Sequence, residues 1–155
     1  MIRRNKNCTD GPLHILLVED NEGDIVLTTE ALEEGKIANS ISIVKDGWKA
    51  IQYLDQNQEE GYGDATKPDL VLLDVNLPKI NGHEVLKHIK SKKELKQIPV
   101  VMLTTSSDEV DIKKSYDNHV NCYITKPVDV DSFIHAISTI EDFWISIVQL
   151  PTKLN

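Results

Sequence analysis

Acidic residues follow two apolar runs of this 155-residue chain, at the point where each run ends. Asp74 comes directly after residues 70–73, and Glu19 and Asp20 come directly after residues 14–18. Three carboxylates brought close together repel one another, and a divalent cation with oxygen ligands relieves that repulsion. A carboxylate can also attack phosphorus and form an aspartyl-phosphate. These residue types therefore indicate metal-assisted phosphoryl chemistry, if the fold brings the two runs together.

A hydroxyl and an ammonium group stand at the ends of two further apolar runs. Thr104 follows residues 98–103, and Lys126 follows residues 121–125. Phosphoryl transfer depends mainly on positioning and on stabilising the charge of the equatorial oxygens. The Thr104 hydroxyl and Lys126 are therefore expected to contact those oxygens. Pro127 follows the lysine, and a cis bond before proline costs far less than before other residues.

The acids suit Mg²⁺, which binds through one or two carboxylates, several waters and a phosphate oxygen. We predict that Asp20 and Asp74 are direct ligands and that the backbone carbonyl of Asn76 is a third. Glu19 is expected to act through a water molecule.

The apolar runs have the character of strands buried on both faces, because they are short and do not alternate with polar residues. Five runs alternate with five segments of helical spacing, which predicts an α/β fold with a parallel sheet covered on both faces. Right-handed crossovers favour a doubly wound, flavodoxin-like sheet of strand order 2-1-3-4-5. The strands are expected near residues 14–18, 41–44, 70–74, 98–103 and 121–125, and the helices near 25–34, 48–54, 85–89, 109–119 and 129–149. In such a sheet all carboxyl ends share one edge, so the acids, Thr104 and Lys126 would meet in one cleft.

Composition narrows the class of protein. The net charge of -8 argues against bulk binding of nucleic acid. Two cysteines, Cys8 and Cys122, give neither a disulfide framework nor paired metal-ligand spacing. No apolar stretch is long enough to span a bilayer, and the basic N-terminus lacks the apolar region of a signal peptide. We therefore expect a cytoplasmic protein that does not bind membranes.

Four motifs taken together resemble the receiver domain of two-component response regulators. They are Leu16-Leu-Val-Glu-Asp-Asn21, Leu72-Leu-Asp-Val-Asn-Leu-Pro78, Thr104 and Lys126-Pro127. The resemblance covers about residues 13–142. It implies a signalling protein rather than an enzyme acting on separate substrates, one that catalyses only its own phosphotransfer and slow autodephosphorylation.

The resemblance also implies roles for single residues. Asp74 would be the modified residue, accepting a phosphoryl group from the phosphohistidine of a sensor histidine kinase. Asp20 would bind Mg²⁺ with Glu19 in support. Thr104 and Tyr123 would form the switch pair, with Tyr123 swinging inward as the Thr104 hydroxyl turns toward the phosphoryl group. Turnover of the phosphoryl group would be tuned by two residues that flank the attacking water, Asn76 and Ser106.

Several features are similar to a narrower group, the phytochrome-associated receivers of cyanobacterial type. Thr105 stands where Ala or Gly often follows the switch hydroxyl, and His119-Val-Asn121 stands where Gly-Ala is common. The segment from Asn121 to Lys126 and the tail with Phe143-Trp144 also fit this group. The resemblance implies a kinase related to phytochromes, whereas the downstream target is not indicated.

We expect three segments: a flexible lead-in (1–12), the receiver domain (13–142), and an extension of the last helix with a tail (143–155). No output domain is apparent, so a stand-alone receiver is expected. The apolar stripe of the last helix continues beyond what a receiver core needs, which favours a homodimer interface. The alternative is that the helix folds back on its own domain.

Three other interpretations are open on the residues alone. A phosphohydrolase of the haloacid dehalogenase type also uses an aspartyl nucleophile, but it has a second Asp two residues later, where this chain has Asn76. A pseudo-receiver would act purely as an interaction module, although the set of Asp20, Asp74, Thr104 and Lys126 argues against it. A flavodoxin is disfavoured because no hydroxyl- and glycine-rich loop follows the first strand. Trp48 and Cys122 are expected to be packing residues.

Overall fold

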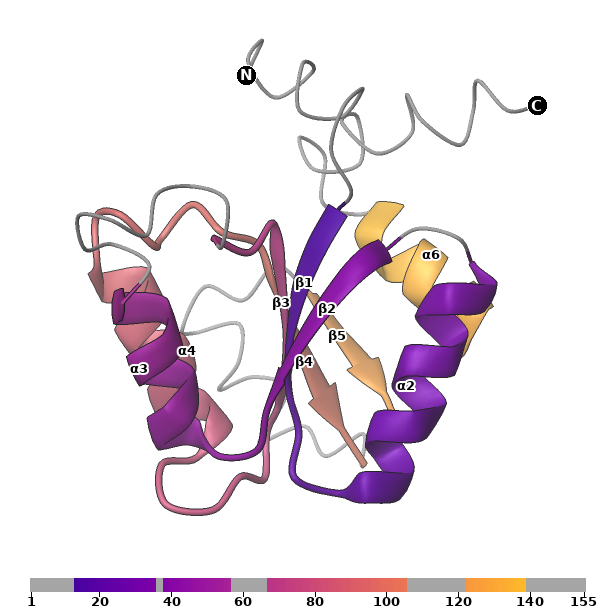
Figure 1. Cartoon of the computed structure of the whole chain (residues 1–155), viewed down its shortest axis with the longest axis horizontal. Helices are drawn as coiled ribbons and strands as arrows, with labels where there is room; N and C mark the ends of the chain where they lie inside the picture. Colours follow the sequence, from indigo (N-terminus) through magenta and orange to yellow (C-terminus); the bar gives the residue numbers. More distant parts are fainter. Residues whose placement is uncertain (1–12, 36–37, 57–66, 106–121, 139–155) are drawn as a thin grey trace, which may run out of the picture.

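A parallel sheet lies between two layers of helices in the computed structural model of the chain (Figure 1). The structure describes residues 13–35, 38–56, 67–105 and 122–138. Its five strands have the order β2-β1-β3-β4-β5, and every neighbouring pair is parallel. The predicted fold class and strand order are therefore confirmed. The strands are β1 (Leu13–Val18), β2 (Ala38–Val44), β3 (Leu70–Asp74), β4 (Val100–Thr104) and β5 (Cys122–Thr125).

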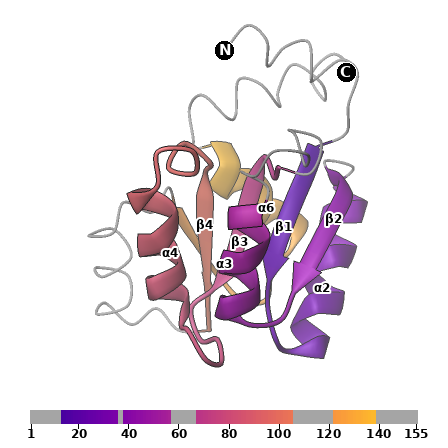
Figure 2. The same ribbon diagram turned by 60° about the vertical axis from the view of Figure 1, so that its left-hand side comes forward.

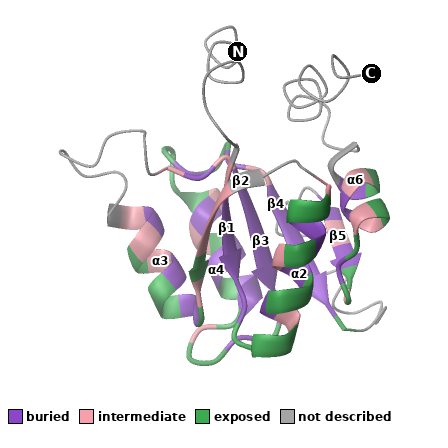
Figure 3. Ribbon diagram, turned by 45° about the vertical axis from the view of Figure 1, so that its right-hand side comes forward, coloured by how far each residue is buried: buried purple, intermediate pink, exposed green. Residues whose placement is uncertain are grey.

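The central strands are buried on both faces. Every residue of β3 and of β4 is buried, and so are residues 15–18 of β1 (Figure 3). Two apolar cores account for this, because alternate residues of a strand point to opposite faces of the sheet. Ile15 and Leu17 belong to one core, whereas Leu16 and Val18 belong to the other. The unbroken apolar runs in the sequence thus reflect helices on both sides.

Two pairs of helices form the outer layers. Figures 1 and 2 show α2 and α6 on one face of the sheet and α3 and α4 on the other. Ile25, Leu32 and Phe133 contribute to the first core, and Leu54 and Leu86 contribute to the second. No helix of the described residues is long and apolar enough to cross a membrane. The helices are α2 (Glu22–Glu34), α3 (Gly47–Gln56), α4 (Gly82–Ser91) and α6 (Val130–Ser138).

Parts of the predicted helical layer lie outside the described residues. These are the helix expected at 109–119 and the end of the last helix beyond Ser138. The extended apolar stripe and the homodimer based on it therefore stay predictions, as does the division of the chain into three segments.

Two large apolar side chains of the helices are about half exposed. Leu27 in α2 is 47% exposed, and Trp48, which was expected to be a packing residue, is 50% exposed at the start of α3. Ile25, Thr28 and Leu32 are the buried stripe of α2, and Leu27 lies two positions from Ile25, which turns it away from the sheet. Cys122 is buried, as predicted.

Capping side chains fix where the helices begin. Asn21 accepts a hydrogen bond from the Asp24 backbone N–H (2.9 Å) at the start of α2. Asn81 and Glu84 form a reciprocal capping box at the start of α4. Both caps follow turns that leave the carboxyl ends of β1 and β3, so the caps place the first turns of α2 and α4 beside that edge of the sheet.

Gly82 allows α4 to approach the end of β3 closely. A Cβ atom at this position would lie 2.2 Å from the Asp74 carbonyl oxygen and 2.8 Å from the Val75 Cα. The Gly82 amide donates to the Val75 carbonyl at 2.9 Å. Only glycine fits between two backbones at this distance. The loop from Asp74 to Gly82 is therefore held against the strand that carries the predicted phosphoacceptor.

We expect Gly82→Ala to lower the free energy of unfolding by about 2–4 kcal/mol, because the added methyl group must push backbone atoms apart. Gly23→Ala is the matched control, since Gly23 also lies in a first helical turn but meets only the Asn21 Oδ1 atom, at 3.2 Å. Its effect should stay within about 1 kcal/mol. Urea denaturation measures both, and equal losses would contradict the steric argument.

Candidate functional site

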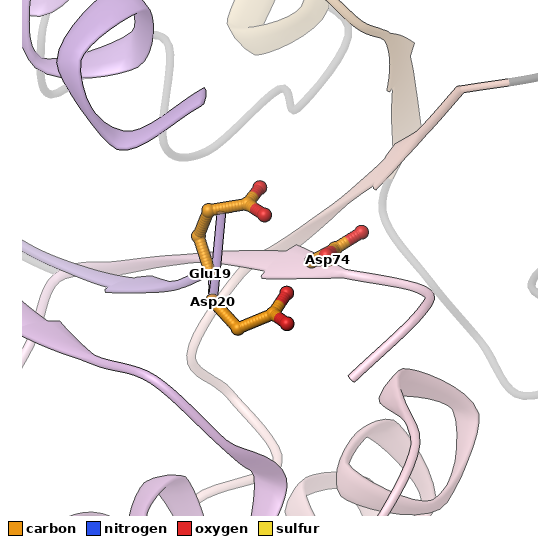
Figure 4. A group of neighbouring side chains, drawn as sticks. All are labelled: Glu19, Asp20 and Asp74. Carbon is orange, nitrogen blue, oxygen red and sulfur yellow. The ribbon is translucent and has the colours of Figure 1, made fainter. Parts of the chain in front are cut away.

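Glu19, Asp20 and Asp74 form an acidic cluster at the carboxyl edge of the sheet. β1 and β3 are paired so that Val18 lies opposite Leu73, which brings the residues that follow them together. One carboxylate oxygen from each acid lies within 4.8 Å of the others. Figure 4 shows the three carboxyl groups gathered beyond the strand ends. Glu19 and Asp74 are buried, whereas Asp20 is exposed.

Lys126 extends into this cluster from the end of β5. Its Nζ atom donates to Glu19 Oε1 at 2.9 Å and lies 3.3 Å from Asp74 Oδ1. It also donates to Asp24 Oδ2 at 2.9 Å. The Lys126 side chain is 7% exposed, so these ion pairs are largely shielded from water. The Lys126–Pro127 peptide bond is cis.

The sequence interpretation missed Asp24. A partial signal was available, because Asp24 lies in the first turn of the helix that follows β1, and that turn starts at the carboxyl edge of the sheet. Asp24 is separated from Lys126 by 102 residues.

Thr104 and Tyr123 lie on the same face of neighbouring strands. Tyr123 pairs with Met102 and packs against the core under α3 and α4, to which Met102 belongs. Thr104 is buried at the end of β4, two residues after Met102, and therefore points to that face as well. Its carbonyl accepts from the Lys126 amide at 2.7 Å. The switch role of this pair stays a prediction.

Asn76 lies beside Asp74 on the loop after β3. Its backbone amide donates to Asp74 Oδ1 at 3.2 Å, and its side chain is exposed. The ligand role predicted for the Asn76 carbonyl stays a prediction. Ser106, the second residue expected to flank the attacking water, lies outside the described residues.

Burial and like charge dominate the electrostatics of the cluster. Burial raises the pKa of Glu19 to about 7, the hydrogen bond from Lys126 works against this rise, and the charge of Asp74 adds to it. Burial by itself lowers the pKa of Lys126, but hydrogen bonds to Asp24 and Glu19 and the charge of Asp74 outweigh it and raise that pKa. Lys126 therefore remains an ammonium ion, which cannot neutralise all of these carboxylates.

The acidic cluster fits a hard divalent cation. Its three side chains offer only oxygen ligands, and burial, with a smaller contribution from the charge of Asp74, raises the pKa of Glu19 to about 7. Mg²⁺ and Mn²⁺ prefer such ligands. A cation among Glu19, Asp20 and Asp74 would supply the positive charge that the cluster lacks.

Comparison with known proteins agrees with this geometry. Residues 15–138 match the family model described as "Response regulator receiver domain". This chain belongs to that family. The resemblance based on sequence motifs is thus confirmed, and the receiver is a signalling domain of two-component systems.

Phytochrome response regulators are among the similar proteins. The receiver is 45% identical to response regulator Rcp1 from Synechocystis sp., over 90% of this chain and 94% of that protein. The phosphorylated cyanobacterial phytochrome response regulator RcpA is 49% identical over 88% of this chain and 96% of its own, with a TM-score of 0.70. The Mn²⁺-bound form of Rcp1 is 46% identical over 86% of this chain and 94% of its own, with a TM-score of 0.67.

We expect the raised pKa of Glu19 to make stability depend on pH when divalent cations are absent. The folded protein binds this proton more tightly than the unfolded chain, whose ordinary value is 4.5. The stabilisation is therefore fully present below about pH 4.5 and is lost as the pH rises through about 7. Between about pH 5 and 8 the free energy of unfolding should fall by roughly 3 kcal/mol from this group.

Denaturant titrations with EDTA at several pH values measure this dependence. Glu19→Gln should remove the part of the pH dependence of the unfolding free energy that Glu19 contributes. Glu22→Gln, a change at an exposed acid, should leave that pH dependence unchanged. Parallel pH profiles for the wild type and Glu19→Gln would show that Glu19 titrates normally.

Proposed function

We propose that the receiver accepts a phosphoryl group on Asp74 from a sensor histidine kinase, with Mg²⁺ bound in the acidic cluster. The observation that carries this proposal is the placement of a buried carboxylate, Asp74, beside the ammonium of Lys126 and within 4.8 Å of carboxylate oxygens of Glu19 and Asp20. A carboxylate can act as a nucleophile toward phosphorus, and the neighbouring positive charge is placed to offset the charge of the phosphoryl group.

The transfer exchanges one bond to phosphorus for another. An oxygen of Asp74 attacks the phosphorus atom, the P–N bond to the kinase histidine breaks, and its electron pair returns to the imidazole, which can take up a proton. Lys126 and the Thr104 hydroxyl neutralise charge on the phosphoryl oxygens as it develops. Asp20, Asp74 and the Asn76 carbonyl would hold Mg²⁺, with Glu19 acting through water, and the ion would add positive charge beside the same oxygens.

The signal would leave through Thr104 and Tyr123. Thr104 lies at the end of the strand next to Asp74, and Tyr123 lies on the same sheet face one strand further out. Tyr123 is half-buried, so part of its side chain can still become buried. A turn of the Thr104 hydroxyl toward the phosphoryl group would leave space for that movement.

The kinase partner is proposed to be phytochrome-like and the receiver to be cytoplasmic. RcpA supports the proposed kinase, since it is described as a phytochrome response regulator. The phosphoryl group would be lost by slow autodephosphorylation, with Asn76 and Ser106 beside the attacking water. A receiver confined to residues 13–142, with the last helix forming a homodimer, belongs to the same proposal.

A phosphohydrolase of the haloacid dehalogenase type fits the site less well. Such an enzyme needs an acid or base two residues after its nucleophile, and the neutral amide of Asn76 occupies that position. A side-chain amide does not ionise near neutral pH, so it cannot act as the general acid or base. A pseudo-receiver, which acts only as an interaction module, does not require an ammonium buried against Asp74.

We expect Asp74→Asn to abolish labelling of the protein by radioactive acetyl phosphate or by a phosphorylated kinase, because an amide cannot form the acyl phosphate. Asp69→Asn is the matched control, since Asp69 precedes the same strand at its other end and binds the His14 amide. Labelling should reach the wild-type stoichiometry in the control. Retained labelling of Asp74→Asn would refute Asp74 as the acceptor.

We expect Thr104→Ala to keep labelling at Asp74 within about tenfold of the wild-type rate but to lose the response of Tyr123, because the hydroxyl links the two. NMR of fluorotyrosine-labelled protein, before and after acetyl phosphate, measures that response. Thr125→Ala, at the neighbouring and exposed position of β5, is the control and should keep it. An unchanged Tyr123 response in Thr104→Ala would reject the switch pair.

A further inference from the structure

Asp24 contacts the site, but the proposed function gives it no task. Its Oδ2 atom accepts from Lys126 Nζ at 2.9 Å, the same distance as the bond to Glu19. The approach of Lys126 to Asp74 is longer, at 3.3 Å. An ammonium group has three N–H donors, and here three carboxylates surround it. Asp24 therefore takes up part of the positive charge that would otherwise lie against Asp74.

We propose that Asp24 is a positioning residue that draws the Lys126 ammonium away from Asp74 and so leaves Asp74 available to a divalent cation. The inference rests on the proposed function, because it assumes that the acidic cluster binds Mg²⁺. It extends that function by assigning a task to a residue outside the acidic cluster.

Lys126 and a bound Mg²⁺ would compete for the same carboxylates. Lys126 contacts Glu19 and Asp74, and both belong to the cluster that would bind the metal. An ammonium that pairs closely with these carboxylates neutralises them and lowers their attraction for Mg²⁺. A carboxylate on the far side of the ammonium weakens this competition, because it offers Lys126 another acceptor.

Asp24 is well placed for this task because α2 fixes its position. Its backbone N–H is bound by the Asn21 side chain, and it lies in the first turn of the helix, where a negative charge is favourable. Its side chain is 26% exposed, so the charge of Asp24 is more easily hydrated than that of Asp74, at 3%. Asp24 can therefore hold Lys126 at the margin of the cluster without being part of it.

The same helical turn supplies a matched control. Glu22 is also an acid in the first turn of α2, but it pairs with Lys45, and its side chain is 72% exposed. Glu22→Gln and Asp24→Asn both remove one negative charge near the helix N-terminus. Only Asp24→Asn removes a negative charge that is paired with Lys126.

Calorimetric titration of the full chain with MgCl₂ tests the proposal. We expect Asp24→Asn to weaken Mg²⁺ binding about three- to tenfold, since Lys126 then pairs more fully with Glu19 and Asp74. Glu22→Gln should stay within about twofold of the wild type, because an exposed charge is screened. Asp24→Glu, which keeps a carboxylate, should recover part of the affinity. Equal affinities for Asp24→Asn and Glu22→Gln would overturn the proposal.

A double-mutant cycle separates positioning from a direct effect of charge. In a Lys126→Met background the ammonium is absent, so adding Asp24→Asn should change Mg²⁺ affinity by less than about twofold. If Asp24→Asn weakens binding as much in that background as in the wild type, Asp24 acts through its own charge and the proposal fails.

The rate of phosphorylation by acetyl phosphate gives a second readout. For Asp24→Asn, the Mg²⁺ concentration that gives the half-maximal rate should rise by the same three- to tenfold factor, about as much as the binding constant. The rate at saturating Mg²⁺ should stay within about twofold of the wild type. A wild-type protein that binds no Mg²⁺ would defeat the proposed function itself, whereas a wild type that binds Mg²⁺ with the affinity of Asp24→Asn would defeat only this inference.

Discussion

The site of this receiver depends on one shared ammonium group. Lys126 lies among carboxylates from β1, β3 and the first turn of α2, with Nζ–O distances of 2.9 to 3.3 Å. Burial makes each of these charges costly by itself, and the pairing with Lys126 offsets only part of that cost. The raised pKa of Glu19 reports the remainder. The cluster is thus built to gain a second cation, and its affinity for that cation follows from how tightly Lys126 is held.

Parallel pairing of the strands makes this arrangement possible. Because β1, β3, β4 and β5 run in one direction, the residues that follow them meet at one edge although they are far apart in sequence. Close packing then limits where the backbone can go. The Asp74–Gly82 loop is pressed against its own strand, and a single methyl group at Gly82 would collide with the Asp74 carbonyl. Rigid surroundings of this kind keep reacting groups in place without a cost at the moment of reaction.

Family membership and the side-chain contacts of the site describe different properties of this receiver. The family match covers residues 15–138 and reports what this chain shares with other receivers. The contact between Asp24 and Lys126 is a property of this chain's own side chains. The proposed consequence is that Lys126 competes less strongly with a metal ion for the carboxylates of the acidic cluster. It follows from Coulomb attraction and from the three N–H donors of the lysine. Relatives with another residue at this position should therefore differ in metal affinity while sharing the same chemistry.

Short-range patterns in the sequence determined the fold class and most of the site. Unbroken apolar runs predicted which strands are buried on both faces. Asp74, Thr104 and Lys126 were predicted as site residues because they stand at the ends of such runs. The half exposure of Trp48 was not predicted, because residue type by itself does not say how much of a side chain at a helix end is covered. The partnership of Asp24 with Lys126 was decided only by tertiary structure. It depends on the distance between a helix and a strand 102 residues apart, which packing sets and local sequence does not.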